Sequence, residues 1–590
     1  MTFMVLTEST LPRLLWNAAL GKRVCVIALR SLIGGTTRHL EWLAMHLQTR
    51  GLLIWISDLR PDLIPFTDYG DLMRIADPFV DAEAWVCRFF AFDHAENQYG
   101  EYATAYRHLC CNAVFQRFGA AHICDGVVSE GLAVEASIYG LDTVDRSYYR
   151  ERFLSGLSCG SSKHGPTLFM NFALLFSVMV KSSLWIFRRL RLSPPSPKSV
   201  FMGSDFTGGG HDNHLWDEVI DGGGDVMAVM RNSGVSKAHA GTTLDYPHCE
   251  TSDGWFTLGK GLVAWVEVLR SGFRLFCRGR HLPPDFFRKL IILPHKRIVY
   301  RALFNRYHFS YFWSRDEYNS DHIMRSQELR KAGGKSMGIM HGIPSICILT
   351  HQCRYLDFDR FYMLGQDQYD RLYRSTWPSH MTVRSIGSFG LSREKIKKMA
   401  DLRPNNIVCF LSPSYHHETI MAGIEDIARR FPDRTVFLNI KSRKYIAGQF
   451  GKDLSRLLNR APVNLVLDER RSYELLFDCQ YVINESSTLT AEAVQFGHFA
   501  FVLDPDPRTK NLYYRQIPEI CLASSEKIAG RICQIEAGEW RYPRELFSSI
   551  INLKGPISWD IIRADMGLTQ SRARNDTATC KPIEFPKNKA

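Results

Sequence analysis

The sequence lacks the cysteine patterns of extracellular and zinc-binding proteins. Its 15 cysteines are scattered through 590 residues, and no CxxC pair or Cys/His cluster with zinc spacing occurs among them. Such cysteine usage is typical of reduced, mostly buried thiols in a cytosolic protein. The N-terminal stretch also lacks a basic flank followed by a long apolar core, so we expect no signal peptide.

A dinucleotide-binding fingerprint is absent as well. The apolar run Gly21–Ser31 precedes a Gly-Gly-Thr-Thr turn, a helical stretch at 38–50 and a second apolar run at 52–56. This order predicts a strand, a helix and a strand, the opening unit of a doubly wound sheet. The turn does not match GxGxxG, so a NAD site is not expected. With a further strand at 121–128, residues 1–160 are predicted to form a small α/β region.

No apolar run is long enough to predict a transmembrane helix. Pro166–Val180 is the most apolar stretch, but Lys181 interrupts it before the aromatic and arginine-rich segment at 184–191. This pattern argues against a membrane span. Two interpretations remain, a buried helix that links domains or a monotopic helix anchored at lipid headgroups. The stiff sequence Ser193–Pro197 then predicts a domain boundary, so 161–197 is assigned to an apolar helix and a linker.

Composition and charge indicate a globular, multidomain protein with an anionic partner. Hydrophobic residues make up 45% and charged residues 23% of the chain, and the formal net charge is +12. A chain of this length is expected to divide into two or three domains. The charge favours a nucleotide, a polyanionic glycan, a nucleic acid or a membrane surface. Because the basic residues are dispersed and no recognised nucleic-acid module occurs, we expect no nucleic-acid partner.

Strand-like and helix-like segments alternate through the rest of the chain, which predicts parallel α/β domains. We therefore expect a Rossmann-like domain at 198–400 and a second one at 401–545. Residues 546–590 form a predicted C-terminal extension, with a disordered polar tail from about 570.

The stretch Tyr473–Asp504 carries the clearest candidate site. It reads as a helix, a strand at 481–484, a turn, a helix at about 489–496 and a strand at 499–503. The turn Glu485-Ser486-Ser487-Thr488 supplies hydroxyl caps for the second helix, whose N-terminus favours an anion. The serines could serve as helix caps only, or they could hold a phosphate, and the two roles are compatible.

Polar side chains also follow the neighbouring predicted strands. In open α/β sheets, ligands bind beyond the carboxyl ends of the strands. Hydroxyl, imidazole and ammonium groups gathered there suit a nucleoside monophosphate or diphosphate, although each alone could be an ordinary surface group. The predicted donor-side residues at these ends are Ser412, Ser414, His416 and Lys441, beside Glu485, Ser486, Ser487 and Thr488.

His341 is the leading catalytic candidate. It ends a predicted strand at 335–340 and begins the turn His341-Gly-Ile-Pro344, which places an imidazole on a rigid loop. It could act as a general base or donate to a leaving phosphate, and the alternative is a histidine satisfied in the core. Asp316 and Glu317 lie shortly upstream. Either could be the base or orient His341, or both could only favour the next helix N-terminus.

The motif order resembles bacterial GT-B glycosyltransferases of surface polysaccharides over residues 300–545. The shared motifs are the His-Gly-x-Pro turn, Ile386-Gly387, the Ser-rich loop after the strand at 406–411, Lys441 and Glu-Ser-Ser-Thr-x-x-x-Glu. Sialyl-, Kdo- and CDP-glycerol glycerophosphotransferase enzymes are similar in this order. The resemblance implies two Rossmann-like domains facing a cleft, with Ser486, Ser487, Thr488 and Glu492 on the nucleotide-donor side and His341 near the donor phosphate.

The resemblance also implies metal-independent chemistry without a cofactor, since no Asp-x-Asp motif ends a recognisable strand. The Asp/Glu-Gly base motif of sialyltransferases is matched only weakly, by Cys124-Asp-Gly126. We therefore expect transfer of a sugar from a nucleotide-sugar donor to a bacterial capsule, lipopolysaccharide or lipid-linked glycan acceptor. The expected location is cytoplasmic, with peripheral contact at the inner face of the membrane. The alternatives are a CDP-glycerol-type phosphotransferase, a nucleotide-sugar epimerase and a non-catalytic assembly protein.

Overall fold

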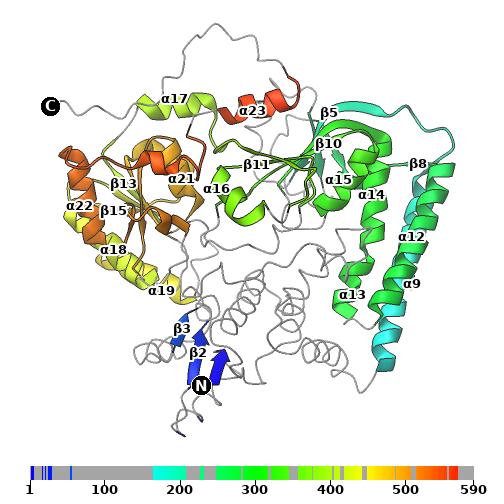
Figure 1. Ribbon diagram of the computed structural model, residues 1–590, viewed down its shortest axis with the longest axis horizontal. Coiled ribbons are helices and arrows are strands. Elements are labelled where there is room, and N and C mark those ends of the chain that lie inside the picture. Colours follow the sequence, from blue (N-terminus) through cyan, green and yellow to red (C-terminus); the bar gives the residue numbers. More distant parts are fainter. Residues whose placement is uncertain are drawn as a thin grey trace.

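Two parallel α/β domains lie side by side in the structure, which is a computed structural model (Figure 1). It describes residues 164–206, 219, 226–230, 247–280, 284–315, 321–343, 356–374, 377–401, 404–411, 417–440, 448–485, 487–505, 513–553 and 557–568, with short stretches at 2–5, 16, 20, 24–28 and 53–55. The predicted α/β class with a pair of Rossmann-like domains is confirmed. The exact bounds of the domains stay a prediction.

The first domain contains a seven-stranded sheet in the order β12-β11-β10-β9-β5-β6-β7. Every neighbouring pair is parallel. Its strands are β5 (Lys198–Phe206), β6 (Val226–Met230), β7 (His248–Glu250), β9 (Tyr307–Ser314), β10 (Lys335–Ile339), β11 (Arg360–Met363) and β12 (Thr382–Ser385). Strand β6 is fully buried and uniformly apolar, as expected where a sheet is covered on both faces.

Helices of the first domain form a bundle beside this sheet (Figure 1). They are α9 (His164–Arg189), α12 (Leu258–Gly279), α13 (Pro284–Ile291), α14 (Leu293–Arg306) and α15 (Asp321–Lys331). The short strands β4 (Leu190–Arg191) and β8 (Phe256–Thr257) pair in parallel, which ties the end of α9 to the start of α12. Leu175 of α9 belongs to the same buried cluster as Val200 of β5, so α9 packs on the domain that follows it.

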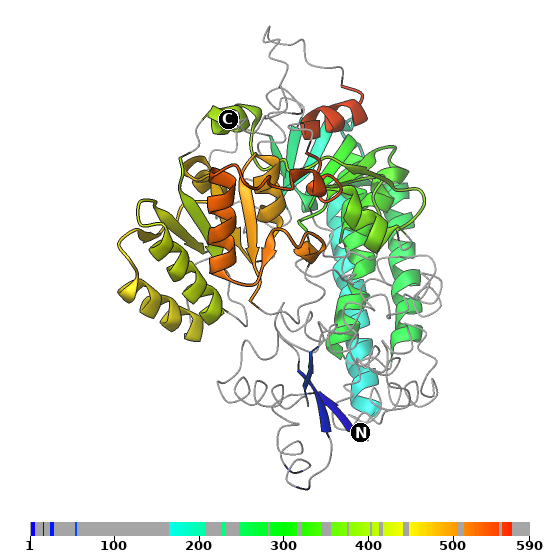
Figure 2. The same ribbon diagram turned by 60° about the vertical axis from the view of Figure 1, so that its left-hand side comes forward.

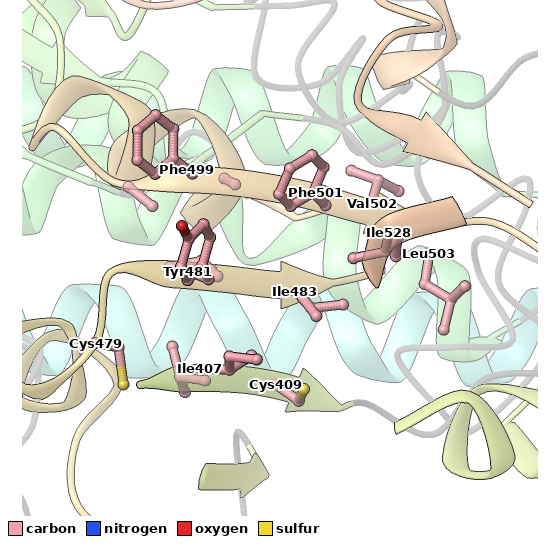
Figure 3. Packing of buried hydrophobic residues seen from close by; sticks show 14 of the residues in the cluster. Ile407, Cys409, Cys479, Tyr481, Ile483, Phe499, Phe501, Val502, Leu503 and Ile528 are labelled. Carbon is pink, nitrogen blue, oxygen red and sulfur yellow. The ribbon is translucent and has the colours of Figure 1, made fainter. Parts of the chain in front are cut away.

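The second domain is built on a six-stranded parallel sheet in the order β15-β14-β13-β16-β17-β18. Its strands are β13 (Ile407–Leu411), β14 (Val436–Ile440), β15 (Leu465–Leu467), β16 (Tyr481–Asn484), β17 (Phe499–Leu503) and β18 (Cys521–Leu522). Its helices are α18 (His417–Arg430), α19 (Gly448–Arg460), α20 (Ser472–Leu475), α21 (Thr488–Gln495) and α22 (Ser525–Glu536). Figure 3 shows Ile407, Tyr481 and Phe501 from three adjacent strands packed in one layer of the core.

Two segments connect the domains. The first runs from β12 past the short helix α17 (Arg393–Asp401) to β13. The second leaves the second domain after a 3₁₀ turn at Arg544–Phe547 and ends in α23 (Ile557–Asp565), which returns to the first sheet (Figure 1). Trp559 of α23 is completely buried in a cluster with Trp313 and Tyr362. The chain therefore finishes the first domain with residues that the sequence pattern assigned only to an extension.

The described N-terminal residues include a small parallel sheet. It contains β1 (Thr2–Val5), β2 (Val24–Ala28) and β3 (Leu53–Trp55). The strands predicted within 21–31 and 52–56 are confirmed. β1 was not predicted, and the strand predicted at 121–128 lies outside the described residues, as does the tail from 570. In the first domain, α16 (Gln366–Gln368) and a π-helical turn at Tyr369–Tyr373 follow β11.

Candidate active site

The turn between β16 and α21 forms the N-terminus of a buried helix. Ser487 is the helix cap, with an extended backbone, and its hydroxyl accepts a hydrogen bond from Leu489 N–H at 3.3 Å. The first turn of α21 contains no acidic residue. The positive end of the helix dipole is therefore not offset by a carboxylate in the first turn, which favours a bound anion.

Two hydrogen bonds fix the position of this turn. The Tyr514 hydroxyl donates to the Ser487 carbonyl oxygen at 2.8 Å, and Thr490 Oγ1 donates to Asn484 Oδ1 at 2.6 Å. Tyr514 is fully buried. Sequence reasoning missed Tyr514 because it lies in a 3₁₀ turn, Tyr513–Gln516, well separated from the motif along the chain.

The His341 turn of the first domain touches the helix N-terminus of the second. Ile343 N–H donates a hydrogen bond of 2.8 Å to Thr488 Oγ1. A Cβ atom at Gly342 would overlap the same hydroxyl, so only glycine allows this approach. His341 itself is exposed, which excludes the alternative of a histidine satisfied in the core. Two motifs predicted separately from the sequence therefore meet at the boundary between the domains.

Glu492 of α21 contacts the segment that connects the domains, at Ser388. Its side chain is buried, and its Oε1 accepts hydrogen bonds from Ser388 Oγ and from the Tyr473 hydroxyl, each at 2.7 Å. Ser388 follows Gly387, a glycine with φ of +78°, where the chain leaves the first sheet. Burial raises the pKa of the Glu492 carboxyl, and the two hydroxyls and the charge of Arg315 offset part of that rise. Through these hydrogen bonds, Glu492 attaches α21 to the connecting segment at Ser388 and to Tyr473. Its contact with a donor stays a prediction.

Replacing Glu492 with glutamine is expected to raise stability at neutral pH by about 1 kcal/mol, because a buried carboxylate costs more than a buried amide. A carboxyl whose pKa is raised by folding stabilises the protein below its unfolded value, near 4.5, and loses that contribution as pH rises. The difference between variant and parent should therefore shrink as pH falls toward about 4.5. Thermal unfolding of Glu492→Gln and of the parent protein at several pH values measures this difference in stability.

The matched control is Glu492→Ala. This change leaves the hydroxyls of Ser388 and Tyr473 without their shared acceptor, which is expected to cost about 1–3 kcal/mol. Equal stabilities for the glutamine and alanine variants would contradict the proposed role of these hydrogen bonds.

Arg315 is a basic residue that the sequence analysis did not single out. It follows β9, and its guanidinium carbon lies 5.2 Å from the centroid of the Phe389 ring. Its charge also acts on Glu492 and Tyr473, so it lies close to the connection between the domains. A lone arginine after a strand gives no sequence signal of this placement.

The loop after β15 begins with two acidic residues, Asp468 and Glu469, and Asp468 is used in local structure. Arg470 donates to both carboxylate oxygens of Asp468 and also binds Asp478 at 2.6 Å. The Arg470 side chain lowers the pKa of Asp468. Asn439, at the end of β14, donates to the carbonyl oxygens of Asp468 and Arg470 at 2.8 and 2.9 Å. These hydrogen bonds hold the loop that follows β15 against the end of β14.

The remaining predicted site residues are only partly described. Glu485 follows β16 and is half-buried. The other predicted positions lie outside the described residues, namely Asp316, Glu317, Ser412, Ser414, His416, Lys441 and Ser486. Within the described part of the chain, no group of three or more His, Cys, Asp or Glu side chains could hold a metal ion.

No family model matches the sequence, and no curated protein matches it significantly. Among solved structures, UDP-GlcNAc 2-epimerase from Neisseria meningitidis bound to UDP-GlcNAc is 12% identical over 63% of this chain and 100% of its own, with a TM-score of 0.40. MurG from Acinetobacter baumannii is 13% identical over 63% and 100%, with a TM-score of 0.34. A variant of the wall teichoic acid polymerase TagF is 7% identical over 69% and 97%, with a TM-score of 0.40.

Proposed function

We propose that the protein is a glycosyltransferase of GT-B type. It would move a sugar from a nucleotide-sugar donor to a bacterial surface polysaccharide or lipid-linked glycan at the inner face of the membrane. The observation that carries this proposal is the hydrogen bond from Ile343 N–H to Thr488 Oγ1. It places the exposed imidazole-bearing turn of one domain against the anion-favouring helix N-terminus of the other.

The α21 N-terminus of the second domain and His341 of the first domain would have different roles in the reaction. The helix N-terminus at Ser487 and Thr488 would stabilise the negative charge that develops on the leaving phosphate. His341 would take the proton of the acceptor hydroxyl, or donate to the departing phosphate. The other predicted donor-side residues, Ser412, Ser414, His416, Lys441 and Ser486, complete the proposal, and no metal ion or cofactor is assigned a part in it.

The proposal is tested by thermal unfolding with CMP-, UDP-, GDP- and CDP-linked sugars. A donor at a hundred times its dissociation constant is expected to stabilise the protein by about 2.7 kcal/mol. Transfer to glycan would favour the glycosyltransferase, and transfer of glycerol phosphate from a CDP-linked donor would favour the phosphotransferase alternative. Interconversion of free nucleotide sugars would favour the epimerase.

A matched pair of serines separates helix capping from donor binding. Ser487 caps α21, and Ser524 caps α22 in the same domain with nearly the same backbone conformation. Replacing either by alanine is expected to cost about 1 kcal/mol of stability through the lost cap. Only Ser487→Ala should also reduce the stabilisation by the donor. If no nucleotide stabilises the parent protein, or if both variants respond to the donor alike, the proposed phosphate site is wrong.

A further inference from the structure

We propose that the paired helices α9 and α12 form a membrane-docking face that seats the protein on an anionic phospholipid bilayer without spanning it. Figures 1 and 2 both show the two helices side by side at one end of the molecule. They run antiparallel, since the Asn171 side chain donates to the Arg280 carbonyl at one end and β4 pairs with β8 at the other.

One side of α9 is committed to the protein core. Leu175 and Ile186 are buried, and the polar side chains on this side have partners. Ser182 Oγ lies 3.1 Å from His295 Nδ1, and Asn171 donates to Arg280 O at 3.1 Å. Burial lowers the pKa of His295 to about 4, so this pair stays neutral in the interior.

The opposite side of α9 is apolar and exposed. Phe169 is 71% exposed and Phe176 is 61% exposed, although buried packing is the usual place for such side chains. The exposed stripe recurs at intervals of three and four residues, the spacing of one helix face. It consists of Phe169, Phe172, Phe176, Val180, Leu184 and Phe187. The buried-linker interpretation of this segment is therefore wrong.

α12 extends this surface with a second exposed apolar stripe. Its members are Leu258, Leu262, Val263, Val266 and Phe273, of which Phe273 is 61% exposed. Gly272 fits against Leu175 and Phe276 stacks edge-on against Phe172, so the helices touch along their length. Together these residues and the α9 stripe are called the α9–α12 face. The helices of 26 and 22 residues are about 39 and 33 Å long, and the exposed stripe of α9 covers about 27 Å of that length.

The charges on the two helices favour anionic lipid over a second copy of the chain. α9 contains three basic residues and no acidic residue, and α12 contains four basic residues and one acidic residue, Glu267. Glu267 is already paired with Arg301. Two such faces brought together would set basic against basic with no acidic complement. Lipid headgroups with negative charge would instead meet exposed cations such as Arg188 and Lys260.

A membrane-spanning role for α9 disagrees with the packing. The segment Leu168–Arg189 has the length and hydropathy of a span, but it is attached to the first domain through the buried contacts of Asn171 and Ser182. Spanning would break these contacts and leave the exposed stripe of α12 outside the lipid. Shallow insertion in the plane of the interface keeps the contacts and covers both stripes.

Flotation of the purified full-length protein with vesicles tests the proposal. We expect it to float with phosphatidylcholine vesicles that contain phosphatidylglycerol, more weakly without phosphatidylglycerol, and to be released by alkaline carbonate. The double variant Phe176→Glu, Val266→Glu should lower binding about tenfold or more, because it removes apolar burial and places carboxylates among acyl chains. Both positions are exposed, so unfolding midpoints should match the parent.

Val463→Glu is the matched control. Val463 is 99% exposed and apolar but belongs to the second domain, so its variant should float like the parent. Arg188→Gln with Lys260→Gln should reduce only the additional binding that phosphatidylglycerol provides. Equal flotation of parent and double variant, retention after carbonate, or a dimer that the double variant dissociates in the absence of vesicle binding would each overturn the proposal.

Membrane docking by the α9–α12 face is independent of the proposed transfer activity. Stabilisation by a nucleotide sugar should be the same in the double variant as in the parent. Loss of flotation with intact donor binding would support the face alone, and donor binding can fail while flotation succeeds.

Discussion

Replacing His341 with alanine is expected to reduce transfer about 10²–10⁴-fold while the donor still stabilises the protein. A positioned acid or base contributes on that order to the rate. His341 is exposed on the turn that contacts Thr488, so its removal should disturb the reaction rather than the core. The measurements are turnover with the donor identified by thermal unfolding, and the thermal shift of the variant with that donor.

The control for this prediction is another histidine in the same sheet. His308 is exposed near the start of β9, whereas His341 follows the carboxyl end of β10. Because β9 and β10 are parallel neighbours, His308 lies at the amino end of the strands and His341 at their carboxyl end. His308→Ala should leave turnover unchanged. Full activity of His341→Ala would exclude the histidine as the catalytic group.

Replacing Glu328 with alanine is expected to lower the free energy of unfolding by about 3–5 kcal/mol, the cost of removing one partner from a buried ion pair. The Glu328 side chain is 1% exposed and binds Arg297 at 3.1 Å, Arg301 at 2.8 Å and Lys331 at 2.9 Å. Its loss removes a carboxylate that three cations share, and of these Arg301 keeps Glu267 as a partner. Chemical denaturation measures this change. Equal m-values for variant and parent would show that both expose the same surface on unfolding.

The pH dependence gives a second readout of Glu328. Burial would raise its pKa, but hydrogen bonds and charge from Arg301, with Arg297 and Lys331, lower it from 4.5 to about 2. A carboxyl with a depressed folded pKa stabilises the protein above its unfolded value, so this contribution is lost as pH falls from about 4.5 toward 2. The difference between parent and Glu328→Ala should therefore narrow over this interval.

An exposed ion pair in the same domain serves as the comparison. Asp370 binds Arg374 at 2.6 Å, and both side chains are largely exposed. The substitution Asp370→Ala is expected to lower the free energy of unfolding by no more than about 0.5 kcal/mol, because solvent weakens exposed ion pairs. Comparable losses for Asp370→Ala and Glu328→Ala would show that burial does not set the cost.

Local sequence pattern predicted the second domain well. The strands at 481–484 and 499–503 were predicted with the bounds that β16 and β17 have, because both are apolar runs bounded by polar or glycine residues. The Ser487 cap was also predicted, since hydroxyl caps act within one helical turn. These signals involve neighbours along the chain, which is why periodicity and propensity detect them.

The contacts between distant segments could not be predicted in the same way. Thr488 and Ile343 are separated by 145 positions, and no local pattern encodes their hydrogen bond. Glu492 gave the signal of a donor-side carboxylate but is buried against Ser388 and Tyr473, because tertiary packing decides which polar groups leave the solvent. α23 was missed because a short helix of nine residues has too few periodic positions to stand out.

The return of α23 to the first sheet has a consequence for the order in which the protein can fold during synthesis. Trp559 covers Trp313 and Tyr362, but it leaves the ribosome only after the entire second sheet has been made. At about 5–20 residues per second, the uncovered face of the first sheet therefore waits on the order of ten seconds or more. Chain connectivity thus makes the domain that is started first the one that is completed last.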